Sequence, residues 1–153
     1  MREFSSMPAT TNGTLRLRKL LLGLVLVAFS IVALAAYYQN RPWKVPEEAK
    51  QLKNPIPSSP QALAAARAVY LEKCANCHGD AGKGDGPDAA NYFPSPTNLT
   101  DARHVNSVTD GEIFYQISQG RKPMPGFKRR LTEEQRWQLV LFVRSLAAPP
   151  LGK

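Results

Sequence analysis

The sequence predicts an all-α domain preceded by a single helix that spans a membrane. Residues 20–38 are almost entirely apolar, and as a helix they would reach about 28 Å, close to the hydrocarbon thickness of a bilayer. Two capping boxes, at 109–112 and 132–135, each predict the start of a helix in the second half of the chain. No segment alternates polar and apolar residues as a half-buried strand does, so no sheet is predicted.

The first 38 residues form the predicted anchor region. Residues 1–19 are expected to be a cytoplasmic tail, polar and unpatterned over its first 14 residues and basic at its end, and residues 20–38 the transmembrane helix. A signal peptide is the alternative, because Ala33 and Ala35 offer a small-residue cleavage site. The apolar run is longer than the roughly 7–15 residues of a signal core, which favours an uncleaved anchor.

The segment that follows the anchor is expected to be a linker. Residues 39–59 are rich in proline, which predicts an extended and fairly stiff linker. Ser58 or Ser59 can cap a helix whose first turn accommodates Pro60, and this helix opens the domain predicted for residues 60–148.

Within that domain, loops and helices are marked by their end signals. Glycine and proline dominate residues 79–96 and predict irregular loop. The helix that starts at the first capping box is expected to end at Gly120. The second is expected to run to about Leu146, before the prolines that open a C-terminal tail, residues 149–153.

Composition narrows the classes of function. The chain carries 20 Lys and Arg against 12 Asp and Glu, a formal net charge of +8, which favours acidic partners. No basic helix, finger or aromatic stacking platform accompanies this charge, so nucleic acid is not a predicted partner. Two cysteines are too few for a disulfide scaffold or a four-sulfur zinc site.

Both cysteines lie in one five-residue motif, Cys74-Ala75-Asn76-Cys77-His78. In this spacing two sulfurs reach the two vinyl groups of a porphyrin from one turn, and the next histidine lies under the iron. A thioredoxin-type dithiol would sit beside a βαβ pattern, and a zinc knuckle would have only His104 as a further ligand. The motif therefore predicts one covalent haem c, bound through Cys74 and Cys77, with His78 as an iron ligand.

The second axial ligand is predicted to be Met124. The other two methionines, Met1 and Met7, precede the membrane segment. Met124 lies between two prolines that stiffen its loop, and a thioether ligand favours ferrous iron and raises the reduction potential. His104 is the alternative ligand, but its polar neighbourhood favours a solvated surface histidine.

Residues 60–148 resemble a class I cytochrome c domain: few helices and long loops around one covalent haem. The features that match are the motif with its leading helix, the Gly82–Pro87 loop, the Phe93–Leu99 segment, the Gly120–Phe127 loop and the terminal helix with Trp137. The resemblance places the carbonyl that accepts the Nδ1 proton of His78 near Gly86-Pro87, and Pro87 is the expected residue. Ala66 stands where the family often has glycine at the crossing of the first and last helices. Tyr92, Thr97, Asn98 and Arg103 are candidate propionate contacts, while Tyr70, Trp137, Leu141 and Phe142 are expected to pack in the core.

These features predict electron transfer by a bacterial, membrane-tethered cytochrome, either a free shuttle or a haem subunit of a respiratory or photosynthetic oxidoreductase, and not an enzyme in itself. If protein fills both axial positions, no coordination site is open to substrate. A haem enzyme or ligand sensor whose methionine dissociates is the alternative. Haem attachment is extracytoplasmic, so the domain is expected on the periplasmic side of the inner membrane. A basic run around Met124 predicts redox partners with acidic docking surfaces; it consists of Arg121, Lys122, Lys128, Arg129 and Arg130.

Overall fold

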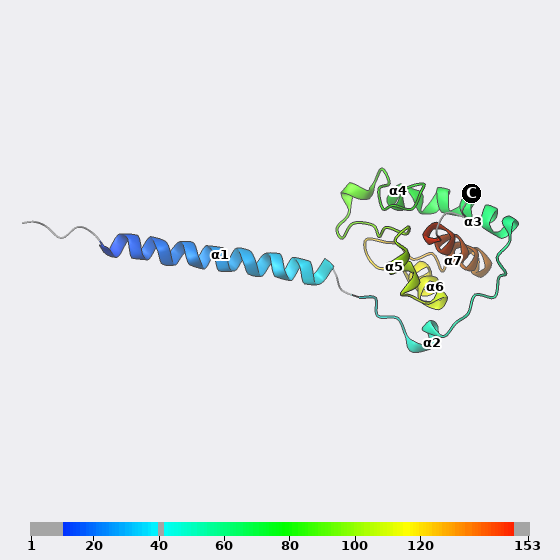
Figure 1. Cartoon of the computed structure of the whole chain (residues 1–153), viewed down its shortest axis with the longest axis horizontal. Coiled ribbons are helices and arrows are strands. Elements are labelled where there is room, and N and C mark those ends of the chain that lie inside the picture. The colour runs from blue at the N-terminus through cyan, green and yellow to red at the C-terminus, as the bar shows by residue number, and fades with distance from the viewer. Residues whose placement is uncertain (1–10, 40–41, 149–153) are drawn as a thin grey trace, which may run out of the picture. The chain divides into compact units, whose positions relative to one another are not determined.

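The computed structural model describes residues 11–39 and 42–148, and the chain divides into two units, Met1–Pro42 and Trp43–Lys153 (Figure 1). The first unit contains helix α1 (Thr11–Gln39). The regular structure described in the second unit is also helical, apart from an isolated bridge between Arg121 and Met124. The predicted all-α fold, with one apolar helix at its start, is confirmed for the described residues.

Helix α1 begins earlier than the sequence predicted. Residues 11–19 were expected in the tail, yet the helix starts at Thr11; the leucine, arginine and lysine residues that follow favour helix. Its stretch Gly13–Tyr37 is 25 residues long and is apolar enough to cross a membrane. Ser30 keeps its hydroxyl satisfied by donating to the carbonyl of Leu26 at 2.8 Å. Residues 1–10, most of the predicted tail, lie outside the described residues.

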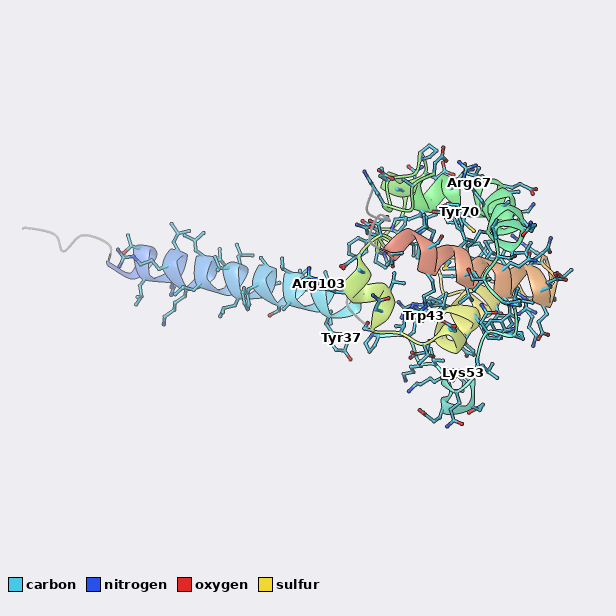
Figure 2. All side chains as sticks on the ribbon, turned by 45° about the vertical axis from the view of Figure 1, so that its right-hand side comes forward. Tyr37, Trp43, Lys53, Arg67, Tyr70 and Arg103 are labelled. Carbon is cyan, nitrogen blue, oxygen red and sulfur yellow. The ribbon has the colours of Figure 1, made fainter. Side chains whose placement is uncertain are left out.

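Most of the predicted linker packs against the domain and is not free. We call residues 43–59 the strap, because they lie against the rest of the second unit; Figure 2 labels Trp43 and Lys53 on it. The strap contains the short helix α2 (Glu47–Lys50), which packs on α6 (Asp110–Gln119). The approach is close: a Cβ on Gly111 would lie 1.9 Å from the carbonyl oxygen of Ala49.

Two further contacts fix the strap. The hydroxyl of Thr109 donates to the carbonyl of Lys50 at 2.8 Å. The amide of Asn54 donates to the carbonyl of Trp137 at 3.0 Å, across 83 residues of sequence. Ile56 packs against the hydrophobic core. Proline content indicated a stiff segment but carried no information on what that segment would lie against.

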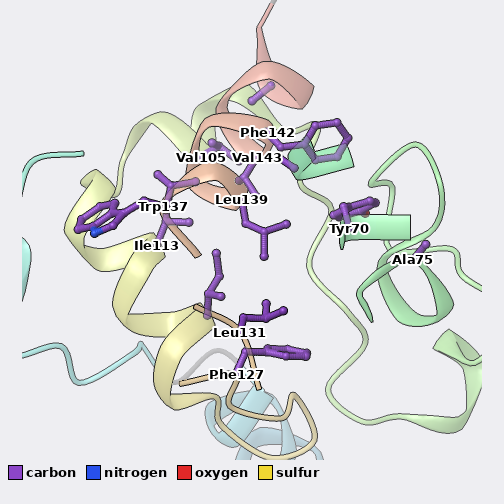
Figure 3. Close-up of a cluster of buried hydrophobic side chains, with 14 residues drawn as sticks. Tyr70, Ala75, Val105, Ile113, Phe127, Leu131, Trp137, Leu139, Phe142 and Val143 are labelled. Carbon is purple, nitrogen blue, oxygen red and sulfur yellow. The ribbon is translucent and has the colours of Figure 1, made fainter. Parts of the chain in front are cut away.

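The core forms where α3 (Pro60–Lys73) crosses α7 (Glu133–Ala147). Helix α3 is capped as predicted, with the Ser59 side chain accepting from the amide of Ala62 at 3.1 Å. Ala66 has no exposed surface, and the rings of Tyr70 and Phe142 lie 4.9 Å apart between their centroids (Figure 3). Burial of these apolar side chains is the main stabilising contribution to the fold.

Helices α6 and α7 begin at the two predicted capping boxes. The Thr109 and Thr132 hydroxyls accept from the third amide of each helix, and the amides of these two cap residues donate to side-chain oxygens of Glu112 and Gln135. Helix α6 ends at Gly120 as predicted. The two helices meet through Phe114, whose ring stacks on that of Trp137 at 3.9 Å.

The sequence did not predict two short elements between the motif and α6. These are the 3-10 helix η1 (Ala89–Asn91) and helix α5 (Ala102–Asn106). Asp101 caps α5 by accepting from the amide of Arg103 at 3.0 Å. The guanidinium of Arg144 in α7 donates to the carbonyls of Val105 and Val108 and pairs with Asp110 at 2.8 Å, which joins three helices.

Candidate haem-binding site

The Cys-Ala-Asn-Cys-His motif forms one tight turn directly after α3. Cys74 ends α3, and the next four residues form the short helix α4 (Ala75–His78). The amides of Cys77 and His78 both donate to the carbonyl of Cys74, at 3.1 and 2.9 Å. Both sulfurs and the imidazole therefore project from a single turn, which is the arrangement that covalent haem attachment needs.

The two thiols are unpaired, and neither has the electrostatics of a redox dithiol. Burial, with a smaller contribution from Cys77, raises the pKa of the Cys74 thiol to about 11. Burial also raises the pKa of Cys77, and Asp88 adds to this effect. Thioredoxin-type chemistry requires a thiol pKa below its ordinary value, so this environment argues against that alternative.

The ring of His78 is fixed by a hydrogen bond from its Nδ1 to the carbonyl oxygen of Thr97 at 3.0 Å. Its Nε2 is therefore the ring nitrogen whose lone pair remains for a metal. Burial lowers the pKa of His78, while the bond to Thr97 opposes this change. A neutral imidazole held by a backbone carbonyl is the usual form of a histidine ligand.

The acceptor for His78 is Thr97 and not Pro87, so that prediction is wrong. The amide of Gly86, immediately before Pro87, donates to the carbonyl of Cys77 at 3.2 Å and ties this part of the loop to the motif's backbone. Pro87 itself is exposed. The resemblance to class I cytochrome c domains correctly implied a backbone carbonyl as the acceptor but placed it at the wrong residue.

Close backbone packing brings Thr97 to the histidine. The amide of Leu99 donates to the carbonyl of Gly82 at 2.7 Å, which lays the segment around Thr97 along the glycine-rich loop. Gly84 has φ +79°, and a Cβ there would lie 2.4 Å from the carbonyl oxygen of Pro96. Only glycine permits this approach and this conformation together.

Met124 lies in the loop between α6 and α7. The amide of Arg121 donates to the carbonyl of Met124 at 2.9 Å and closes the start of the loop. The amide of Phe127 donates to the carbonyl of Ile117 at 3.0 Å and ties its end to α6. Met124 is half-buried and packs against the same hydrophobic core as Cys74. The loop therefore holds a soft sulfur donor at the core that the motif borders.

These residues fit a haem c, because two thiols and one oriented imidazole come from one turn and a thioether packs against the same core. His104 in α5 is exposed, as its polar neighbourhood indicated. In the part of the chain that the structure describes, no group of three or more His, Cys, Asp or Glu side chains could hold a separate metal ion. Sequence reasoning missed the role of the Thr97 carbonyl, because a backbone acceptor leaves no trace in residue type.

Comparison with known families identifies the domain. A sequence profile described as cytochrome c oxidase, cbb3-type, subunit III matches residues 61–143, more than half of the chain. The chain belongs to this family of c-type cytochromes. The match includes the complete motif and Met124, and it assigns the cytochrome to haem-based electron transport.

The chain is also similar to individual proteins of known sequence or structure. The cbb3-type cytochrome c oxidase subunit FixP of Bradyrhizobium diazoefficiens is 33% identical over 79 residues, which are 51% of this cytochrome. The cytochrome spans only 25% of the length of FixP. A chain of the reducing HAO-like protein complex of Kuenenia stuttgartiensis is 25% identical, with a TM-score of 0.55 over 73% of this cytochrome and 54% of that chain. A solved c-type cytochrome is 30% identical over 54% of this chain and 98% of its own, with a TM-score of 0.49.

Proposed function

We propose that this cytochrome transfers single electrons as an anchored haem subunit of a membrane complex related to cbb3-type oxidases, and that it is not itself the catalytic subunit. The observation that carries the proposal is the orientation of His78, whose Nδ1 is bonded to Thr97 while Nε2 stays available. The family match and the likeness to FixP support a place beside an oxidase.

Each site residue has a proposed role. Cys74 and Cys77 would form the two thioether bonds, and His78 and Met124 would supply the protein ligands to the iron. Haem c supplies one-electron chemistry when it is bound. The protein's part would be to supply both ligands and to exclude water from the site, because polarity and ligand identity set the potential of the haem. Tyr70 stabilises the end of the motif by donating to the carbonyl of Gly79 at 2.7 Å.

The strap favours a fixed subunit over a free shuttle. A long extended linker would let the domain travel between partners. Here the chain is engaged with the domain from Trp43 onward, so only residues 40–42 separate α1 from the second unit. We propose that α1 is an uncleaved anchor, that the N-terminal tail is cytoplasmic and that the domain is periplasmic.

Haem stoichiometry tests the cofactor assignment. The full-length protein, purified from membranes of a host that matures cytochromes c, should contain one haem per chain in the pyridine haemochrome assay. Cys74→Ser and Cys77→Ser should each lose one thioether bond, seen as a shifted haemochrome spectrum, and the double variant should lose covalent haem. Full covalent haem in the double variant would contradict the assignment.

Carbon monoxide binding tests the ligation and separates the main proposal from the alternative of a ligand sensor. The reduced wild-type protein should not bind carbon monoxide at neutral pH, because Met124 holds the sixth position. Met124→Ala should bind it readily. Rapid binding by the wild type would favour the sensor, and an inert Met124→Ala variant would rule out Met124 as a ligand.

A further inference from the structure

The strap meets the loop of Met124 through a pair of side chains that the haem site does not use. The guanidinium of Arg121 lies over the ring of Trp43, 4.5 Å from its centroid. Trp43 is the first residue of the second unit, and Arg121 is the first residue of the loop after α6 and Gly120. A cation over the face of tryptophan is the strongest of the cation–π pairings that side chains form.

The same arginine is bonded to the proposed iron ligand through its backbone. The amide of Arg121 donates to the carbonyl of Met124 at 2.9 Å, and the two residues form the isolated bridge that closes the loop. Between them lie only Lys122 and Pro123. Because only two residues connect them and a hydrogen bond joins their backbones, a shift of Arg121 moves Met124 as well.

The other end of the pair is also held. Helix α2 begins four residues after Trp43, and the amides of Ala49 and Lys50 donate to the carbonyl of Pro46 at 3.1 and 3.2 Å. The half-buried indole is thus presented by a segment that is itself packed on α6. A ring on a free linker would give the loop no such support.

We propose that Trp43 and Arg121 form a latch that positions Met124, so that the segment leaving the anchor helps to hold the sixth iron ligand. Trp43 and Arg121 are positioning residues, since they act on the iron site through the loop and not by touching it. This inference rests on the proposed ligation by Met124. As a consequence, how readily Met124 would leave the iron depends on the strap, which connects the anchor to the domain.

Imidazole titration of the oxidised full-length protein measures how readily the loop releases Met124, since imidazole binds only when the methionine leaves the iron. Trp43→Leu and Arg121→Gln should each raise the affinity for imidazole about two- to five-fold, the factor expected from an exposed cation–π pair. The double variant should show no further rise, because both substitutions remove the same contact. Amide hydrogen exchange at Arg121 should quicken by a similar factor in Trp43→Leu.

Two control variants make the outcome decisive. Lys122→Gln removes a neighbouring charge of the same loop and should leave the imidazole affinity unchanged, which excludes a general charge effect. Met124→Ala should bind imidazole far more tightly than any latch variant. If Met124→Ala behaves as the wild type, the proposed ligation fails. If it binds tightly while Trp43→Leu and Arg121→Gln match the wild type, or if their effects add, the latch is overturned and the ligation stands.

Discussion

Replacing Gly84 with alanine would push the carbonyl of Thr97 away from His78. A Cβ on Gly84 would lie 2.4 Å from the Pro96 oxygen, 3.3 Å from the Pro96 carbonyl carbon and 3.4 Å from that of Thr97. All three are backbone atoms, so no side chain can rotate to make room. Gly82 is a matched control with the same φ of +79°, but its Cβ would meet the flexible end of Leu146 at 2.7 Å.

The two glycines separate backbone strain from displacement of the acceptor. Alanine in the left-handed region costs about 1–2 kcal/mol at either position. At Gly84, moving Pro96 to an ordinary contact distance requires a shift approaching 1 Å, and the bond of 3.0 Å from His78 to Thr97 would then be lost. A lost hydrogen bond adds about 0.5–1.5 kcal/mol. Gly84→Ala should therefore lower the free energy of unfolding by about 1.5–3.5 kcal/mol, and Gly82→Ala by about 1–2 kcal/mol.

The reduction potential is the sharper measurement. The bond to Thr97 makes the imidazole more electron-donating, which stabilises ferric iron, so its loss should raise the potential. Spectroelectrochemical titration of the purified full-length protein should show a rise on the order of tens of mV for Gly84→Ala and a much smaller change for Gly82→Ala. Equal potentials in the two variants would refute the role assigned to Thr97.

Three other variants test separate parts of the molecule. Tyr70→Phe removes the bond to the carbonyl that follows the motif and should lower the free energy of unfolding by about 1 kcal/mol in denaturant titration; an unchanged midpoint would contradict this. Asn54→Ala removes the hydrogen bond to Trp137 and should destabilise the domain by about 1 kcal/mol. It should also speed proteolytic cleavage in the strap, and a cleavage rate equal to that of the wild type would mean that this bond does not hold the strap. Arg129→Glu combined with Arg130→Glu should slow electron exchange with an acidic partner at low ionic strength; identical rates at every salt concentration would exclude docking on this surface.

Local signals in the sequence predicted the starts of α3, α6 and α7 and the end of α6. Ser59, Thr109 and Thr132 act as caps because each hydroxyl reaches the amide three residues on, a contact that needs no knowledge of the rest of the fold. Gly120 ends α6 for an equally local reason, its positive φ.

Features that depend on distant segments were missed. The strap is held by Asn54 and Ala49 against α6 and α7, and a proline-rich composition cannot report such contacts. The acceptor for His78 was misplaced because the carbonyl of Thr97 reaches it through backbone packing at Gly84. The residue types in the motif were enough to predict the kind of site, but long-range packing determines which backbone groups support it.

The identity of both axial ligands is tested most directly by near-infrared magnetic circular dichroism of the oxidised full-length protein. The charge-transfer band in this region differs between histidine–methionine, bis-histidine and histidine–water coordination. We predict the histidine–methionine band in the wild type and its loss in Met124→Ala. A bis-histidine or histidine–water spectrum in the wild type would contradict ligation by His78 and Met124, and with it the proposal of a closed electron-transfer site.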